Sequence, residues 1–183
     1  DLLTPGPVDQ KEDTRFFGSE PPYPRLSERR DVLVFQTVPL TEPVEVTGRM
    51  TVHLWISSSA LDTDFTARLV DVHPANEDYP EGFDMILNDS VIRCRYREGF
   101  EREVLMTPGE IYPVTIELPP TSNLFDVGHR LRVDVSSSNW PRLDANPNTG
   151  APLGRHTHQV VAEQTVYADA DHPSHIVLPV IPG

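Results

Sequence analysis

The sequence predicts an all-β domain, built as a two-sheet sandwich of the jelly-roll type. Apolar residues recur at every second position in several segments, and proline is abundant at 19 of 183 residues. A strand places residues i and i+2 on one face, so a half-buried strand alternates apolar and polar side chains. Proline interrupts helices but suits the turns between short strands. No segment shows helical apolar spacing for more than a turn or two.

The chain opens with residues 1–31, which we expect to form an extended arm packed on a domain of residues 32–183. Five prolines punctuate this polar stretch, at positions 5, 7, 21, 22 and 24. Such a segment has too few apolar residues to form a core by itself. It lacks the basic and apolar regions of a signal peptide, which favours a cytoplasmic location.

The period-two pattern begins at residue 32, with the short apolar run 32–35. A long strand is predicted over 44–56, with a bend at Gly48 because glycine weakens a strand interior. Its apolar face consists of Val44, Val46, Met50, Val52, Leu54 and Ile56. Further alternation predicts strands over 64–73, 92–97, 112–118, 130–135, 158–168 and 176–180. About eight strands that share one core form a sandwich or a barrel, and the long strands and connections favour a jelly roll.

The charge balance argues against two classes of partner. The formal net charge is −13, with 15 Lys and Arg residues against 28 Asp and Glu residues. Such a surface repels nucleic-acid phosphates and anionic membranes. No stretch approaches the ~20 apolar residues of a membrane span. We therefore expect neither nucleic acid nor a membrane as a partner, and the single cysteine, Cys94, is expected to be a small buried apolar residue.

The sequence offers no catalytic residue. An α/β-hydrolase nucleophile needs glycines two residues on either side of the serine, and the runs Ser57–Ser59 and Ser136–Ser138 have none. We predict no cofactor and no metal site. His156 and His158 would share a strand face at metal spacing, but surface roles are favoured. Two Asp-x-Asp pairs, Asp62 with Asp64 and Asp169 with Asp171, could bind Ca²⁺, although turn capping is the favoured interpretation.

Several short phrases follow one another along residues 32–182. They are Val-Glu-Val-Thr-Gly at 44–48, Asp-Thr-Asp-Phe-Thr-Ala-Arg-Leu-Val-Asp-Val at 62–72, Pro-Gly-Glu-Ile-Tyr at 108–112, Gly-His-Arg-Leu-Arg-Val at 128–133 and Ser-Ser-Ser-Asn-Trp-Pro-Arg at 136–142. In this order and spacing they resemble the C-terminal domain of the cocaine-esterase/NonD hydrolases, X-prolyl dipeptidyl-peptidases and α-amino-acid ester hydrolases.

The resemblance implies a galactose-binding-like jelly roll without catalytic residues of its own. In that family the jelly roll packs on an α/β-hydrolase domain that carries a Ser-His-Asp triad and cleaves acyl esters or amides. Four residues are candidate contacts to such a domain, because Trp and Arg often anchor interfaces and the leucines lie on the arm. These candidates are Leu2, Leu3, Trp140 and Arg142.

Three arginines of the predicted strand 92–97 would share one face and repel one another unless they are paired. They are Arg93, Arg95 and Arg97, with Asp62, Asp64 or Asp71 as expected partners.

Two other functions stay open at the level of sequence. A carbohydrate-binding module needs exposed aromatic side chains, and Trp55 and Trp140 are the only indoles. A free-standing interaction domain would expose an apolar patch. The sequence leaves the oligomeric state open, a homo-oligomer included.

Overall fold

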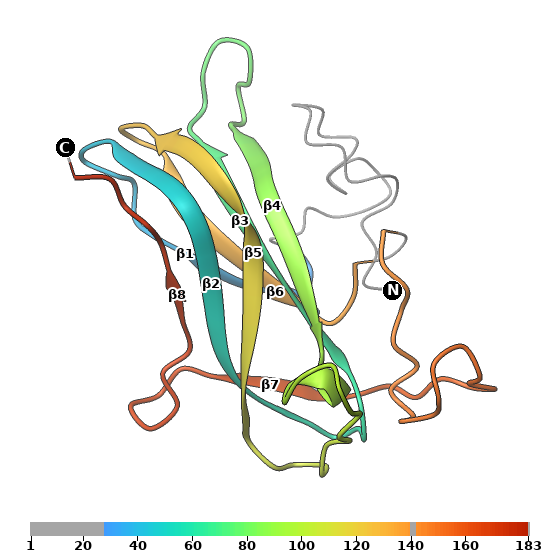
Figure 1. Cartoon of the computed structure of the whole chain (residues 1–183). Helices are drawn as coiled ribbons and strands as arrows, with labels where there is room; N and C mark the ends of the chain where they lie inside the picture. The colour runs from blue at the N-terminus through green and yellow to red at the C-terminus, as the bar shows by residue number, and fades with distance from the viewer. Residues whose placement is uncertain (1–27, 140–141, 183) are drawn as a thin grey trace.

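The computed structural model describes residues 28–139 and 142–182. Its strands form two antiparallel sheets that face each other (Figure 1), which confirms the predicted all-β sandwich. Sheet A has the order β1 (Leu33–Gln36), β6 (Arg130–Ser136), β3 (Asp64–His73) and β4 (Phe83–Arg93). Sheet B has the order β5 (Tyr112–Phe125), β2 (Val44–Ser58) and β7 (Gln164–Tyr167), and β8 (His175–Val177) pairs with β2. No helix in these ranges is long and apolar enough to cross a membrane.

The core lies between the sheets and follows the predicted alternation. Strand β2 and its neighbour β5 in sheet B contribute every second residue, and β3 of sheet A faces them with its own apolar stripe, as two half-buried sheets require. The fully buried members include Val46, Ile56, Phe65, Leu69, Cys94, Ile116 and Phe125. Burial raises the pKa of the Cys94 thiol, which confirms its prediction as a small apolar residue.

Strand β2 bends at Gly48, as the sequence predicts. The pairing with β5 shifts register between Gly48 and Met50, and Gly48 has φ +138°. A side chain here would also meet Pro179, since an added Cβ would lie 3.0 Å from its ring. Both facts favour glycine.

The predicted strand over 92–97 is wrong. Strand β4 covers Phe83–Arg93, and the chain then forms a short 3₁₀ turn, η3 (Cys94–Tyr96). The sequence pattern missed most of β4 because polar residues 88–90 imitate a turn. In the fold, Asn88 and Asp89 are buried and hydrogen-bonded or ion-paired.

Strand β5 is longer than predicted and continues through Pro119 and Pro120. Because β5 is an edge strand of sheet B, proline is tolerated there: the N–H that proline lacks is not needed on the side that has no neighbouring strand. Strand β7 is shorter than the β-rich stretch 158–168, of which only 164–167 pairs with β2. Of the predicted arm, residues 28–31 are described, and Arg29 pairs with Asp31 there.

Candidate domain-docking face

A hollow of about 780 Å³ opens between one edge of sheet A and one edge of sheet B. Leu33 and Val135 line it from sheet A, and Gln164 and Val166 line it from sheet B. The loop over 144–162 closes one side. The hollow therefore lies where the sandwich is not sealed by strand pairing, and the position of the loop decides its shape.

A buried group of charged residues fixes the start of that loop. Asn146 donates hydrogen bonds to Asp62 (2.9 Å) and Asp64 (2.7 Å). Arg93 holds Asp64 with two hydrogen bonds of 2.9 Å, and Arg95 Nε donates to Asp62 at 2.8 Å. We call these five residues the Asp–Arg clamp. It joins the turn before β3 to the end of β4 and to the loop.

The clamp leaves little room for a calcium ion. Every carboxylate oxygen of Asp62 and Asp64 accepts at least one hydrogen bond, so a cation would have to displace two guanidinium groups. Burial raises the pKa of Asp64, and Arg93 and Asn146 oppose that shift. The expected pairing of Arg93 and Arg95 with these aspartates is confirmed. The two arginines do not share a strand face, because Arg93 ends β4 and Arg95 lies in the 3₁₀ turn η3.

The rim of the hollow is apolar and exposed. Leu33 of the edge strand β1 and Val161 of the loop line the hollow and are 43% and 95% exposed. Phe35 extends this rim along β1, two residues from Leu33, and is 45% exposed. Large apolar side chains at one rim are typical of a surface that contacts another protein.

Residues on either side of positions 140–141 contact both the hollow and the outer face of sheet A. Ser136 and Ser137 line the hollow, and Asn139 and Arg142 contact the buried carboxylate of Asp89. Arg142 is 47% exposed, so its guanidinium reaches from a buried acid to the surface. This geometry suits an interface anchor.

Asp89 belongs to a buried set of charges on the outer face of sheet A, which we call the ionic layer. Arg68 of β3 lies in register between Asp89 of β4 and Asp134 of β6. Its other members are Arg132 and Asp84, which form a 2.6 Å ion pair. Loss of hydration lowers the pKa of Arg68 to about 10.

Most of the predicted contact residues cannot be placed. Leu2, Leu3 and Trp140 lie outside the described residues, and Arg142 alone is described. Its role as a contact to a hydrolase domain stays a prediction. The rim residues Leu33, Phe35 and Val161 were not predicted as contacts.

The serine runs serve the fold. Ser57 Oγ lies 3.0 Å from Tyr167 Oη, Ser58 accepts from the Ala60 N–H and Ser59 from that of Glu163. Ser136 shares a 2.7 Å hydrogen bond with Thr66. These contacts join strand ends to their neighbours.

Two further sequence hypotheses can be checked. His156 and His158 lie in a loop, not on a strand, and line different hollows, so the hypothesis that they share a strand face is wrong. Asp169 accepts from the backbone N–H groups of Asp171 and His172, which confirms turn capping.

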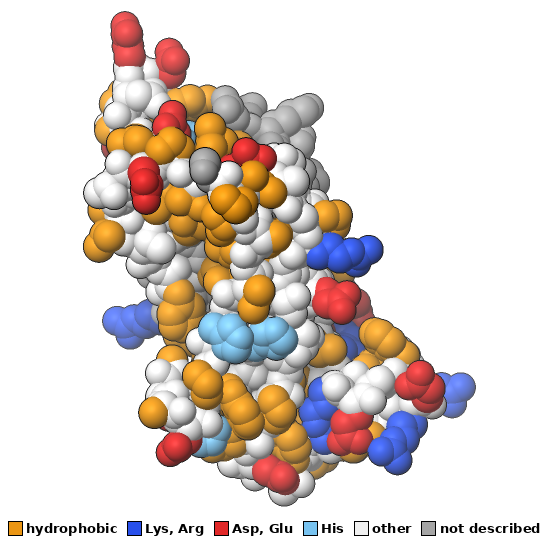
Figure 2. All heavy atoms as spheres, turned by 60° about the vertical axis from the view of Figure 1, so that its left-hand side comes forward, with side chains coloured by type: hydrophobic (Ala, Val, Ile, Leu, Met, Phe, Trp, Pro, Cys, Tyr) orange, Lys and Arg blue, Asp and Glu red, His pale blue; other side chains and the backbone are white. Residues whose placement is uncertain are grey.

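The outer face of sheet B carries hydrophobic and histidine side chains (Figure 2). Trp55 packs edge-on against His172, with ring centroids 5.1 Å apart, and is half-buried. Trp55 therefore presents part of its ring rather than an open platform for a sugar.

Comparison with known proteins assigns this fold to a family. A model of the X-Pro dipeptidyl-peptidase C-terminal non-catalytic domain matches residues 4–177. The chain belongs to this family. The match starts within the stretch that the sequence predicts as an arm.

Relatives of the domain are parts of larger hydrolases. Cocaine esterase from Rhodococcus sp. (strain MB1 Bresler) is 44% identical over 178 residues, covering 96% of this chain and 28% of that protein. Two solved structures have a TM-score of 0.81. An aminopeptidase from the marine sediment archaeon Thaumarchaeota archaeon is 34% identical, covering 85% of this chain and 27% of that one. An α-amino acid ester hydrolase is 36% identical, covering 85% and 26%.

This non-catalytic domain thus spans just over a quarter of the length of the relatives it matches. The resemblance inferred from the sequence is confirmed. A galactose-binding-like fold, in the narrower sense, stays a prediction.

Proposed function

We propose that this chain is the accessory β-domain of a serine hydrolase and docks on the catalytic domain through the hollow. The hydrolase would cleave acyl esters or amides with a triad that this chain does not supply. The domain boundary at residues 31 and 32 is part of the proposal. The observation that supports docking here is the exposed apolar rim of the hollow.

The rim has the composition of an interface with a polar surround. Leu33 and Val161 line the hollow together with Ser137 and Asp144, and Phe35 lies two residues along β1 from Leu33. Burial of apolar area contributes about 25 cal/mol per Å², and polar groups around it fix the orientation. Arg142 adds a cation that is half-exposed and oriented by Asp89.

The first experiment asks whether the chain has a catalytic partner. We expect the reading frame upstream of Asp1 to encode a Gly-x-Ser-x-Gly nucleophile elbow. That upstream segment, produced separately, should bind this chain in isothermal titration calorimetry. A fluorophosphonate probe should label the upstream segment and leave this chain unlabelled. Labelling of this chain would overturn the assignment of catalysis to another domain.

The second experiment tests the docking face. The double variant Leu33→Asp with Val161→Asp should weaken binding of the upstream segment by at least tenfold, because it places two charges in an apolar contact. Val127→Asp is the matched control. Val127 is 56% exposed but precedes β6, whereas the hollow lies at the other end of that strand.

Equal binding by both variants would contradict the docking face while leaving the family assignment intact. A larger loss with Val127→Asp than with the double variant would place the interface at the opposite end of sheet A.

A further inference from the structure

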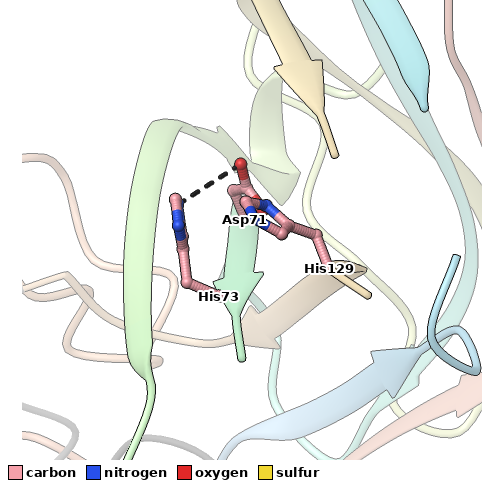
Figure 3. A group of neighbouring side chains, drawn as sticks. All are labelled: Asp71, His73 and His129. Atoms are coloured by element: carbon pink, nitrogen blue, oxygen red, sulfur yellow. Dashed lines mark hydrogen bonds and ion pairs between the residues drawn. The ribbon is translucent and has the colours of Figure 1, made fainter. Parts of the chain in front are cut away.

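Three side chains that could ligate a metal meet at the end of the sandwich away from the hollow (Figure 3). Asp71 and His73 lie two residues apart on β3 and therefore share a face of the strand. His129 comes from the turn that precedes β6. One nitrogen or oxygen atom of each residue lies within 4.8 Å of the other two, and this is the one such cluster of three among the described residues.

The carboxylate of Asp71 is the centre of the group. Its Oδ1 lies 2.8 Å from His129 Nδ1, and its Oδ2 lies 3.5 Å from His73 Nε2. The two imidazole rings are in contact, with centroids 4.2 Å apart. Both nitrogens thus approach the same buried acid.

We propose that Asp71, His73 and His129 bind one divalent transition-metal ion, with Zn²⁺ as the fitting species. Two imidazole nitrogens and one carboxylate oxygen are common zinc ligands, and they suit nitrogen-preferring divalent ions better than calcium. In a tetrahedral site with bonds of about 2.0–2.1 Å, neighbouring ligand atoms are roughly 3.3 Å apart. The 3.5 Å between His73 Nε2 and Asp71 Oδ2 is close to that spacing.

The surroundings prepare each ligand. Asn123 of β5 donates a hydrogen bond to Asp71 Oδ2 at 3.1 Å, which fixes the carboxylate. His73 Nε2 is buried and has no hydrogen-bond partner in the part of the chain that the structure describes. Its nearest acceptor, Asp71 Oδ2 at 3.5 Å, is in ion-pair range but makes no hydrogen bond with it. A buried imidazole nitrogen without a hydrogen bond is unfavourable, and a cation bound by both atoms would satisfy it.

Access and charge also suit the ion. The side chain of Asp71 is 1% exposed, whereas those of His73 and His129 are 26% and 14% exposed. The acid therefore lies beneath two imidazoles that reach solvent, which leaves a path for the ion and an outward position for water. One carboxylate also offsets part of the charge of the cation.

Such an ion would tie together parts of the chain that are distant in sequence. It would link the end of β3 to the turn before β6, and Asn123 would extend the link to sheet B. We therefore assign it a structural role, independent of the docking face.

A second histidine pair provides an internal comparison. His53 and His175 are cross-strand partners of β2 and β8, with ring centroids 4.9 Å apart. They belong to no cluster of three potential ligands in the described ranges. Two imidazoles without a carboxylate should bind Zn²⁺ more weakly than the proposed site.

The test uses the tag-free 183-residue chain, ZnCl₂ and CoCl₂. Calorimetry should show one tight Zn²⁺ equivalent, and Co²⁺ should give visible absorption bands typical of a four-coordinate site. Zinc at 100 times its dissociation constant should raise the unfolding temperature by about 5–10 °C. His73→Ala and His129→Ala should each lower the affinity of this equivalent by roughly 100-fold and abolish the absorption bands. His53→Ala should leave both unchanged.

The variant His73→Ala keeps the test decisive if His129→Ala does not fold, because His73 Nε2 makes no hydrogen bond that would be lost. The proposal is overturned if the intact chain binds no Zn²⁺ below millimolar concentration. It is also overturned if His53→Ala removes the tight equivalent while His73→Ala retains it.

Discussion

The Asp–Arg clamp and the ionic layer both bury arginine beside aspartate, yet they satisfy these charges differently. In the clamp, every side-chain nitrogen of Arg95 has an acceptor: Asp62, Glu103 and the Ala151 carbonyl. In the ionic layer, Arg68 Nε, Arg132 Nε and Asp134 Oδ1 have no hydrogen-bond partner in the part of the chain that the structure describes. Arg132 Nε does lie 3.0 Å from Asp134 Oδ1, but as an ion pair without hydrogen-bond geometry.

This difference indicates different uses of buried charge. A buried ion pair offsets its loss of hydration only when its geometry is good and its remaining atoms are hydrogen-bonded. The clamp meets that condition and positions the loop of the hollow. The ionic layer meets this condition only in part, because three of its buried polar atoms lack a hydrogen bond. We therefore expect the ionic layer to stabilise the fold less for each charge that it buries. Its location beside Arg142 connects it to the proposed docking face.

The largest effect is expected from Arg95→Met in the clamp. This change leaves the carboxylate of Asp62, which is 0% exposed, without its guanidinium. Breaking a buried pair in this way destabilises a protein by about 3–5 kcal/mol. Urea unfolding followed by circular dichroism would measure the free energy of unfolding.

A double-mutant cycle is the control for that prediction. Asp62→Asn combined with Arg95→Met removes the uncompensated charge, so the double variant should be more stable than Arg95→Met alone. If the two changes were additive, the clamp would not behave as a pair.

A smaller loss is expected from Arg68→Met in the ionic layer. Asp89 would retain Asn139 and Arg142, and Asp134 would retain Arg132. The change removes Arg68 Nε, which makes no hydrogen bond, and also the hydrogen bond that Arg68 Nη2 donates to Asn139. We expect a loss of about 1–3 kcal/mol in the same urea experiment. A loss equal to that of Arg95→Met would remove the distinction between the two sites.

The comparison also shows how far the sequence could be interpreted. Alternation predicted the face of β2 that holds Val46 and Ile56 because a purely apolar core leaves a period-two pattern. The pairing of Arg95 with Asp62 was predicted from charge. The burial of charges on the outer face of sheet A was not predicted, because residues such as Arg68 and Asp134 on a strand are typical of a solvated face. Asn139, which follows β6, hydrogen-bonds both Arg68 and Asp89 on this face.

The candidate sites were predictable only in part. Arg142 was chosen for its residue type, whereas the rim of Leu33, Phe35 and Val161 combines an edge strand with a distant loop. The cluster of Asp71, His73 and His129 shows a similar limit. The spacing of Asp71 and His73 indicates one shared face, but Asp71 was expected to pair with arginine. The turn that brings His129 to it is a product of the pairing of β3 with β6.

In the ionic layer, stability also depends on pH through the protonation of Asp134. Burial raises the pKa of Asp134 above its ordinary value of 3.8, with Arg132 opposing the shift. The folded state therefore holds this proton to higher pH than the unfolded state. The resulting stability is fully present below pH 3.8 and is lost as the pH rises through the folded pKa.

Asp134→Asn removes that dependence. Relative to the native chain, this variant should be most destabilised below pH 3.8, and the difference should shrink as the pH rises through the folded pKa of Asp134. Urea unfolding at a series of pH values measures the difference. Asp126→Asn, at an exposed turn, serves as the control for the Asp-to-Asn change itself. The opposite slope for Asp134→Asn would mean that Arg132 outweighs the effect of burial.

The smallest effect on stability is expected from Arg142→Ala, where the ionic layer reaches the surface. Arg142 is 47% exposed, and Asp89 would keep its hydrogen bond from Asn139, so the loss should be about 0.5–1 kcal/mol. Binding of the upstream hydrolase segment should fall by at least tenfold, because a half-exposed arginine oriented by a buried acid is positioned to pair with a partner. Calorimetry of binding and urea unfolding of the same variant separate the two quantities. Arg102→Ala is the matched surface control, since Arg102 is 76% exposed and pairs with Glu98. If Arg142→Ala lost stability but bound normally, Arg142 would belong to the ionic layer alone, and the docking face would depend on the apolar rim.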